Sequence, residues 1–206
     1  MANLVMTEDE TMLADAARGF LDKSAPVKAF RDLRDAGKTH DAKMWKEMAD
    51  MGWAGVLVPE SAGGSDMGHA AAGVLAHEMG KTLVVSPFLS TAVIAATALR
   101  NVSDARAEKA LAAIATGDVT YALAVDEASK FNPEATSMVA TREGNGFRLS
   151  GKKTFVVDGA LADRLLVLAK TDDGLTLFDI PADRAGITRN AQNMIDARDS
   201  ARIDFN

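Results

Sequence analysis

Residues 103–125 read SDARAEKALAAIATGDVTYALAV, and the character of the chain changes within this stretch. From Ser103 to Gly117 the apolar residues recur at three- and four-residue spacing, which predicts a helix that Gly117 ends. The run from Tyr121 to Val125 has the composition of a buried strand. The stretch therefore predicts two domains, a helical one over residues 1–117 and a β domain over residues 118–206.

The sequence before this boundary is typical of a helical domain. Thr7 and Glu10 have the spacing of a capping box, in which each side chain bonds the backbone N–H of the other. Asp41 is expected to cap a third helix, and Ser86 followed by Pro87 predicts the start of a later one. We expect six amphipathic helices. Each begins at or contains one of the following residues: Thr7, Pro26, Asp41, Ala71, Ser86 and Ser103.

The sequence after the boundary predicts short antiparallel strands. Gly144-Asn145-Gly146 and Asp172-Asp173-Gly174 are hairpin signals, because these residues adopt positive φ at little cost. The expected strands cover residues 121–125, 137–141, 147–149, 154–157, 165–169, 175–180 and 203–205. The fold class is therefore α+β, with an N-terminal all-α domain followed by a small antiparallel β-barrel or sandwich.

The composition narrows the class of protein further. The chain has 206 residues, no cysteine and a net charge of −6. The absence of cysteine excludes disulfides and thiolate metal sites, and the negative charge argues against a general nucleic-acid binder. No stretch approaches the roughly 20 apolar residues that span a bilayer. We expect a cytoplasmic protein with no nucleic-acid or membrane partner.

Residues that could carry chemistry are few. His69 and His77 lie eight residues apart, which is too far for a convincing metal pair, and surface or capping roles are the simpler interpretation. Lys152 and Lys153 could meet an anionic ligand, but a solvated strand edge is the simpler reading. Gly63 and Gly64 follow an apolar stretch and allow close backbone approach, although most such loops carry no site.

An ordered set of short segments resembles the acyl-CoA dehydrogenase family. In the helical half these are WKEM (45–48), GWAGVLVPE (52–60), GG (63–64) and HEMG (77–80). In the β half they are YALAVDE (121–127), LSGKKTFVVDGA (149–160) and RDSARIDF (198–205). The first two β segments look like the family's first strand and its flavin-side strand, and the third looks like the strand that closes the family's middle β domain.

The resemblance implies a bound FAD and an acyl-CoA thioester substrate, within fatty acid or steroid side-chain metabolism. In such oxidoreductases a glutamate removes the α-proton while the β-hydrogen leaves as hydride to the flavin. That glutamate, and much of the oligomer interface, is expected in a C-terminal helical bundle that these 206 residues do not include. We therefore expect no catalytic residue and no metal ligand in this chain, and the chain alone is expected to be inactive.

The family pattern places four residues of this chain at the flavin, namely Val125, Asp126, Phe155 and Val157. Three of them depart from it. Asp126 stands where a Thr or Ser is usual, and its carboxylate would oppose the negative charge of a reduced flavin ring. Phe155 stands where a Trp is usual, and Val157 offers no hydroxyl where a Thr or Ser is usual. Ala128 likewise replaces the usual Pro after Glu127, and the Gly-Ser-Asp that follows it in the family is missing.

These departures leave other functions open. A non-catalytic accessory subunit of a heteromeric acyl-CoA dehydrogenase would explain them, whereas an active homo-oligomer would have to tolerate them. An unrelated helix-plus-β binding module is a third reading, in which the same four positions are ordinary strand and core residues.

Overall fold

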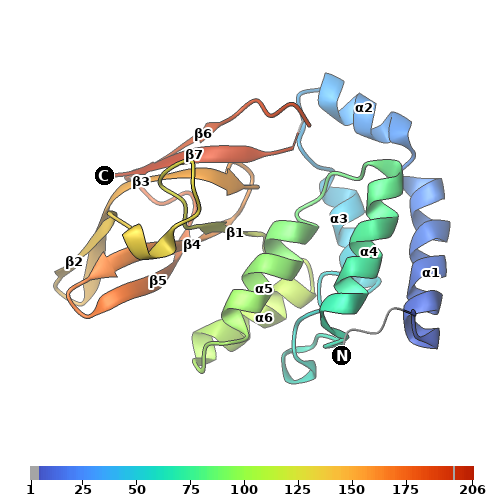
Figure 1. Cartoon of the computed structure of the whole chain (residues 1–206), viewed down its shortest axis with the longest axis horizontal. Helices are drawn as coiled ribbons and strands as arrows, with labels where there is room; N and C mark the ends of the chain where they lie inside the picture. The colour runs from blue at the N-terminus through green and yellow to red at the C-terminus, as the bar shows by residue number, and fades with distance from the viewer. Residues whose placement is uncertain (1–4, 197) are drawn as a thin grey trace. The chain divides into compact units, whose positions relative to one another are not determined.

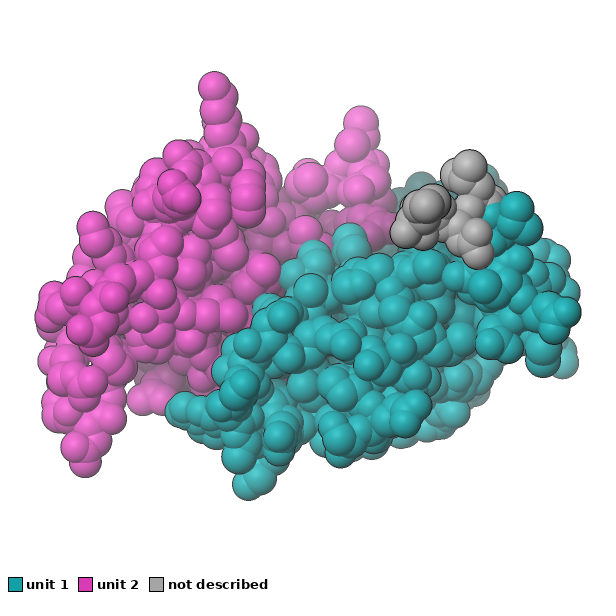
Figure 2. All heavy atoms as spheres, turned by 60° about the horizontal axis from the view of Figure 1, so that its bottom comes forward, with its two compact units in different colours: residues 1–118 teal, residues 119–206 magenta. Residues whose placement is uncertain are grey.

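The computed structural model describes residues 5–196 and 198–206, and Figure 1 shows its elements. The described chain divides into two compact units, the first ending at Asp118 and the second beginning at Val119, as the two colours in Figure 2 show. Whether the two units match independently folding domains over 1–117 and 118–206 stays a prediction.

The first unit is helical, as expected. Its elements are α1 (Glu8–Ser24), α2 (Val27–Asp35), α3 (Ala42–Asp50), η1 (Glu60–Ala62), α4 (Gly68–Thr82), η2 (Phe88–Ala95), α5 (Ala96–Leu99) and α6 (Ala105–Ala115). The capping box at Thr7 and Glu10 is confirmed, with both reciprocal hydrogen bonds present. Asp41 caps α3 as predicted, accepting from the backbone N–H groups of Lys43 and Met44.

Two predicted helix starts are wrong. Asp104 rather than Ser103 caps α6, because its carboxylate accepts from the backbone N–H of Arg106 at 2.7 Å. The helix after Ser86 has Pro87 as its N-cap and is a π-helix over η2 before it continues as α5. A π-helix carries an extra residue in its turn, and no local signal at Ser86 predicts one.

The core of the first unit consists of apolar side chains from several helices. Its largest fully buried members are Leu21, Met48, Val56, Leu57, Leu75 and Ile114. Fully burying such a side chain contributes roughly 1.5–3 kcal/mol. The loop between α3 and α4 packs closely against itself, because a Cβ on Gly64 would lie 2.0 Å from the carbonyl oxygen of Val58. The close backbone approach expected at the paired glycines is therefore found at Gly64.

The second unit is one curled, open sheet. Its strands are β1 (Tyr121–Ala124), β2 (Val139–Glu143), β3 (Gly146–Val157), β4 (Arg164–Thr171), β5 (Gly174–Pro181), β6 (Ile187–Ala191) and β7 (Ser200–Phe205), with a 3-10 turn η3 at Pro133–Ala135. The strand order is β1-β4-β2-β3-β7-β6. β5 lies outside this order and pairs with β4. β3 is one strand over the two separate strands predicted at residues 147–149 and 154–157, and β6 was not predicted.

The predicted small antiparallel barrel or sandwich is wrong in two respects, because the sheet is mixed and it is open. β1 runs parallel to β4, with Tyr121 opposite Arg164, and β2 meets β4 in parallel at Val139 and Lys170. Parallel neighbours need a long connection, and the chain makes β2 and β3 between leaving β1 and entering β4. The hairpins β2–β3 and β4–β5 are antiparallel, as their turn residues predict.

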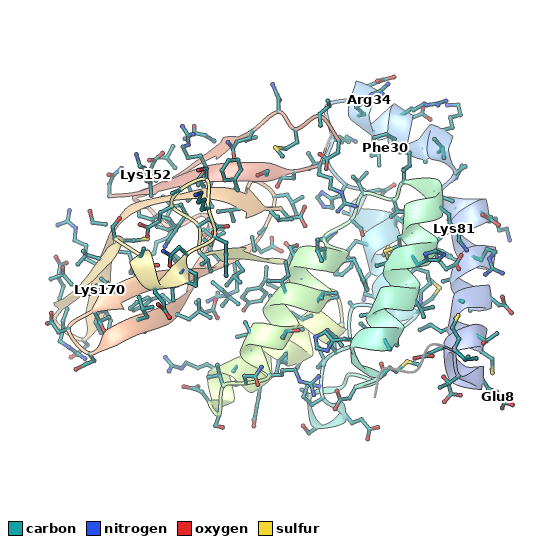
Figure 3. The ribbon with its side chains drawn as sticks, viewed as in Figure 1. Glu8, Phe30, Arg34, Lys81, Lys152 and Lys170 are labelled. Atoms are coloured by element: carbon teal, nitrogen blue, oxygen red, sulfur yellow. The ribbon has the colours of Figure 1, made fainter. Side chains whose placement is uncertain are left out.

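Alternating side chains of the sheet build the core of this unit. Leu165, Val167 and Ala169 of β4 are buried, as are Ile203 and Phe205 of β7. Lys152 on β3 and Lys170 on β4, both labelled in Figure 3, are exposed. In the described part of the chain no helix is both long and apolar enough to cross a bilayer.

Candidate functional site

The four predicted flavin positions lie on two chain segments that the structure brings together. Val125 and Asp126 follow the end of β1, and Phe155 and Val157 lie near the end of β3. The backbone N–H of Thr154 donates to the carbonyl oxygen of Asp126 at 2.8 Å. The two segments are therefore hydrogen-bonded neighbours.

A β-bulge shapes the second segment. The register between β3 and β7 shifts between Lys153 and Val156, and Phe155 within this interval has φ of +52°. Non-glycine residues adopt this left-handed conformation rarely, and a bulky one is an outlier that the surrounding structure must hold. The side chain of Phe155 is 49% exposed. The bulge thus turns an aromatic ring out of the sheet while Val156 enters the core.

Lys153 is buried next to this bulge. Lys152 is exposed, as the interpretation of Lys152-Lys153 as a solvated strand edge requires, although β3 lies between β2 and β7 in the sheet. The interpretation is wrong for Lys153, whose side chain is 0% exposed. Its ammonium donates to the carbonyl oxygen of Val125 at 3.0 Å and to the Glu127 carboxylate at 2.7 Å. No local sequence signal predicts this ion pair, because the two residues lie 26 positions apart.

Glu127 is held from several sides. Its carboxylate accepts hydrogen bonds from the backbone N–H groups of Ser137 at 2.8 Å and Met138 at 3.1 Å, and from the Ser137 hydroxyl. Burial opposes its ionisation, but the hydrogen bonds from Lys153 and Ser137 outweigh burial and lower the pKa of Glu127 to about 2. Burial lowers the pKa of Lys153, and the attraction of Glu127 opposes that shift.

A second carboxylate fixes the end of β3. Asp199 accepts from the backbone N–H groups of Ala160 at 2.9 Å and Leu161 at 3.1 Å, and its own carbonyl accepts from the N–H of Asp158. Asp158 has φ of +56°, so the chain turns sharply directly after Val157. This anchoring fixes the direction of the chain where β3 ends.

The histidines of α4 do not form a site with each other. Both are exposed, and the ring of His69 lies 3.2 Å from the hydroxyl of Thr97. Over residues 5–196 and 198–206 no group of three or more His, Cys, Asp or Glu residues is placed to hold a metal ion.

Comparisons with known proteins identify the family. Residues 7–118 match the family model of the acyl-CoA dehydrogenase N-terminal domain. Acyl-CoA dehydrogenase FadE27 of Mycobacterium tuberculosis is 30% identical over 162 residues, which are 78% of this chain and 42% of that protein. The chain belongs to the acyl-CoA dehydrogenase family, and it spans about half the length of the curated relatives that it matches.

Solved structures agree with this assignment. A variant of the Tcur3481-Tcur3483 steroid ACAD is 29% identical with a TM-score of 0.87, and the match covers 97% of this chain and 55% of that one. The ChsE4-ChsE5 complex from Mycobacterium tuberculosis is 25% identical with a TM-score of 0.89, covering 100% of this chain and 56% of that one. Both matches include the helical unit and the mixed sheet.

The residues of the two segments fit a flavin in part. The exposed ring of Phe155 offers an aromatic face of the kind against which a planar ring system packs. Asp126 fits poorly, because its Oδ1 atom is buried and receives no hydrogen bond from any described residue. A carboxylate oxygen without a donor adds negative charge where a reduced flavin would also carry it.

Proposed function

We propose that this chain is part of an FAD-dependent acyl-CoA dehydrogenase that oxidises the α,β-bond of an acyl-CoA thioester. The observation that carries the proposal is the hydrogen-bonded pair of segments, 125–127 and 153–157, from which the Phe155 ring projects. Family membership supports it. The comparisons identify the family without identifying the acyl chain, so the substrate is proposed at the level of the thioester.

In this proposal Val125, Asp126, Phe155 and Val157 contact the cofactor. Bound FAD would supply the redox chemistry by accepting the hydride that leaves the substrate. The residues of this chain would hold the ring in place and exclude water on one side, which strengthens the hydrogen bonds that polarise a thioester carbonyl. No described residue is assigned as the base that removes the α-proton, and we propose that the base lies outside these 206 residues.

A second function is favoured by Asp126. In a non-catalytic accessory subunit of a heteromeric dehydrogenase, the Asp126 carboxylate, whose Oδ1 atom has no hydrogen-bond donor among the described residues, and the apolar Val157 would not impair any cofactor binding. The ChsE4-ChsE5 and Tcur3481-Tcur3483 structures each bear the names of two components, which is consistent with such an assembly. Under either function the partners are an acyl-CoA and either further copies of this chain or another dehydrogenase chain, in the cytoplasm.

One purification separates the two functions. The full-length protein that contains these 206 residues is expressed alone and together with a second dehydrogenase chain, and FAD is followed by its visible absorption. Flavin that copurifies with the protein alone and is bleached by a linear, branched or steroid side-chain acyl-CoA supports the enzyme. A colourless protein that acquires flavin only with the second chain supports the accessory subunit. Substrate-dependent dye reduction by the 206 residues alone would contradict our assignment of the base to another segment.

A further inference from the structure

Burial of the Lys153 ammonium group costs free energy, because the group is removed from water. Lys153 is 0% exposed in the sheet, yet it follows an exposed lysine and precedes the bulge. Removing two charges from water often costs more than their attraction returns, and well-packed apolar residues at such a position are often at least as stable. Stability alone therefore does not explain a buried lysine here, and its hydrogen bonds point to another role.

The ammonium joins three parts of the chain. It lies on β3, it donates to the Val125 carbonyl just after β1, and it donates to Glu127. Glu127 in turn accepts from the backbone of Ser137 and Met138 just before β2. The Glu127 carboxylate thus closes the loop from residue 127 to residue 138, and Lys153 ties that carboxylate and the exit of β1 to the strand that carries the bulge.

These bonds coincide with the two segments of the candidate site. The Val125 carbonyl is bound to Lys153, and the Asp126 carbonyl is bound to the N–H of Thr154, the next residue along. The backbone on either side of Asp126 is therefore fixed relative to the backbone that precedes Phe155. Phe155 has a left-handed conformation that local preference does not maintain, so an external restraint must hold it.

We propose that Lys153 is the positioning residue of the candidate site, and that its pair with Glu127 sets the spacing between segments 125–127 and 153–157. Its link to flavin rests on the proposed function, but the spacing itself does not. Lys153 touches no reacting atom in this proposal. It acts through the backbone of Val125 and Thr154 and through Glu127.

The test compares Lys153→Met with Lys152→Met in the full chain. Methionine is close in length to lysine and tolerates burial, while Lys152 is the exposed neighbour on the same strand and serves as a matched control. The first readout is amide hydrogen exchange, which needs no cofactor. The second is the FAD dissociation constant together with the visible circular dichroism of bound flavin, a signature that reports how the ring is held.

In Lys153→Met the amides of Ser137, Met138 and Thr154 are expected to exchange at least tenfold faster, while the β4–β5 amides stay within twofold of wild type. FAD is expected to bind at least tenfold more weakly with altered circular dichroism, and Lys152→Met to resemble wild type. If Lys153→Met does not fold, Glu127→Gln removes the charge of the partner, and the same amides are expected to lose protection.

The outcomes are distinguishable. Unchanged exchange at Ser137, Met138 and Thr154, or a uniform increase across the unit, would overturn the positioning role. Faster exchange at these three amides with unchanged FAD affinity and spectrum would overturn its link to the site. A wild-type protein that binds no FAD under any condition would remove the proposed function, and the exchange result would still decide the role of Lys153.

Discussion

Arg18 in α1 donates to Glu78 in α4 at 3.2 Å, joining two helices across 60 positions of sequence. Lys81 holds the same carboxylate at 2.7 and 2.8 Å. Glu78 is 4% exposed, and its burial opposes ionisation. The hydrogen bonds from Lys81 and Arg18 outweigh burial and leave the pKa of Glu78 below its ordinary value. The Arg18–Glu78 ion pair therefore links α1 to α4.

Glu78→Gln is expected to destabilise the protein by about 1–2 kcal/mol, because it weakens hydrogen bonds between charged groups while the two cations can still reach water. Urea unfolding at neutral pH, followed by circular dichroism, measures the change. Asp15→Asn is the control, since Asp15 contacts the same Arg18 from an exposed position and should change stability by less than about 0.5 kcal/mol. Equal stability of Glu78→Gln and wild type would show that the contact carries no net energy.

Gly64→Ala is expected to be strongly destabilising, by roughly 3 kcal/mol or more, because a Cβ would overlap the Val58 carbonyl and force the loop between α3 and α4 to move. Gly73→Ala is the matched control. Gly73 lies within α4, where a Cβ would meet nothing within 4 Å, so alanine should stabilise the helix by about 0.5–1 kcal/mol. Thermal unfolding of both variants measures the contrast. A Gly64→Ala protein with the wild-type midpoint would mean that the loop can relax freely.

The lowered pKa of Glu127 predicts that the second unit loses stability in acid. That pKa is about 2 in the folded chain and about 4.3 in an unfolded one. The unfolded chain therefore binds the proton more readily, and the contribution of Glu127 is complete above about pH 5 and declines as the pH falls toward 2. Urea unfolding midpoints measured between pH 7 and pH 2.5 test this expectation. Glu127→Gln should be less stable at neutral pH and should show a shallower decline, and parallel profiles for the two proteins would contradict the assignment.

Local signals predicted much of the helical unit. The caps at Thr7 and Asp41 depend on residues within three positions of each other, so the sequence displays them directly. The helix starts predicted at Ser86 and Ser103 are wrong, because in each case the next residue along the chain is the N-cap. Asp104 is a better acceptor than Ser103 for the first N–H groups of α6, and a π-helix follows Pro87.

Nonlocal features of the β unit were harder to predict from the sequence. The hairpins follow from their turn residues, but the parallel contact of β1 with β4 depends on how two distant strands meet. Strict alternation along β3 would place Lys153 and Phe155 on the same face. The bulge between them breaks that alternation, so that one side chain is buried and the other is exposed. A lysine at a position that alternates with the apolar Phe147 and Leu149, together with a carboxylate three residues after β1, is the signal that could have revealed the pair with Glu127.

Asp126→Thr tests whether the charge of this residue limits cofactor binding. Threonine removes the carboxylate whose Oδ1 atom lacks a hydrogen-bond donor among the described residues, and it supplies a hydroxyl that can donate. We expect Asp126→Thr to bind FAD at least fivefold more tightly than wild type, as measured by fluorescence quenching of the free flavin.

Asp126→Asn separates charge from hydrogen bonding, because asparagine keeps the shape of aspartate and loses its charge. If repulsion dominates, both variants should gain affinity, and if the hydroxyl dominates, only threonine should. Because the backbone carbonyl of Asp126 is bound to Thr154 and does not depend on the side chain, neither substitution should change the fold of the segment. Wild-type affinity in both variants would mean that Asp126 does not contact flavin, and the accessory-subunit function would then be the better account of this position.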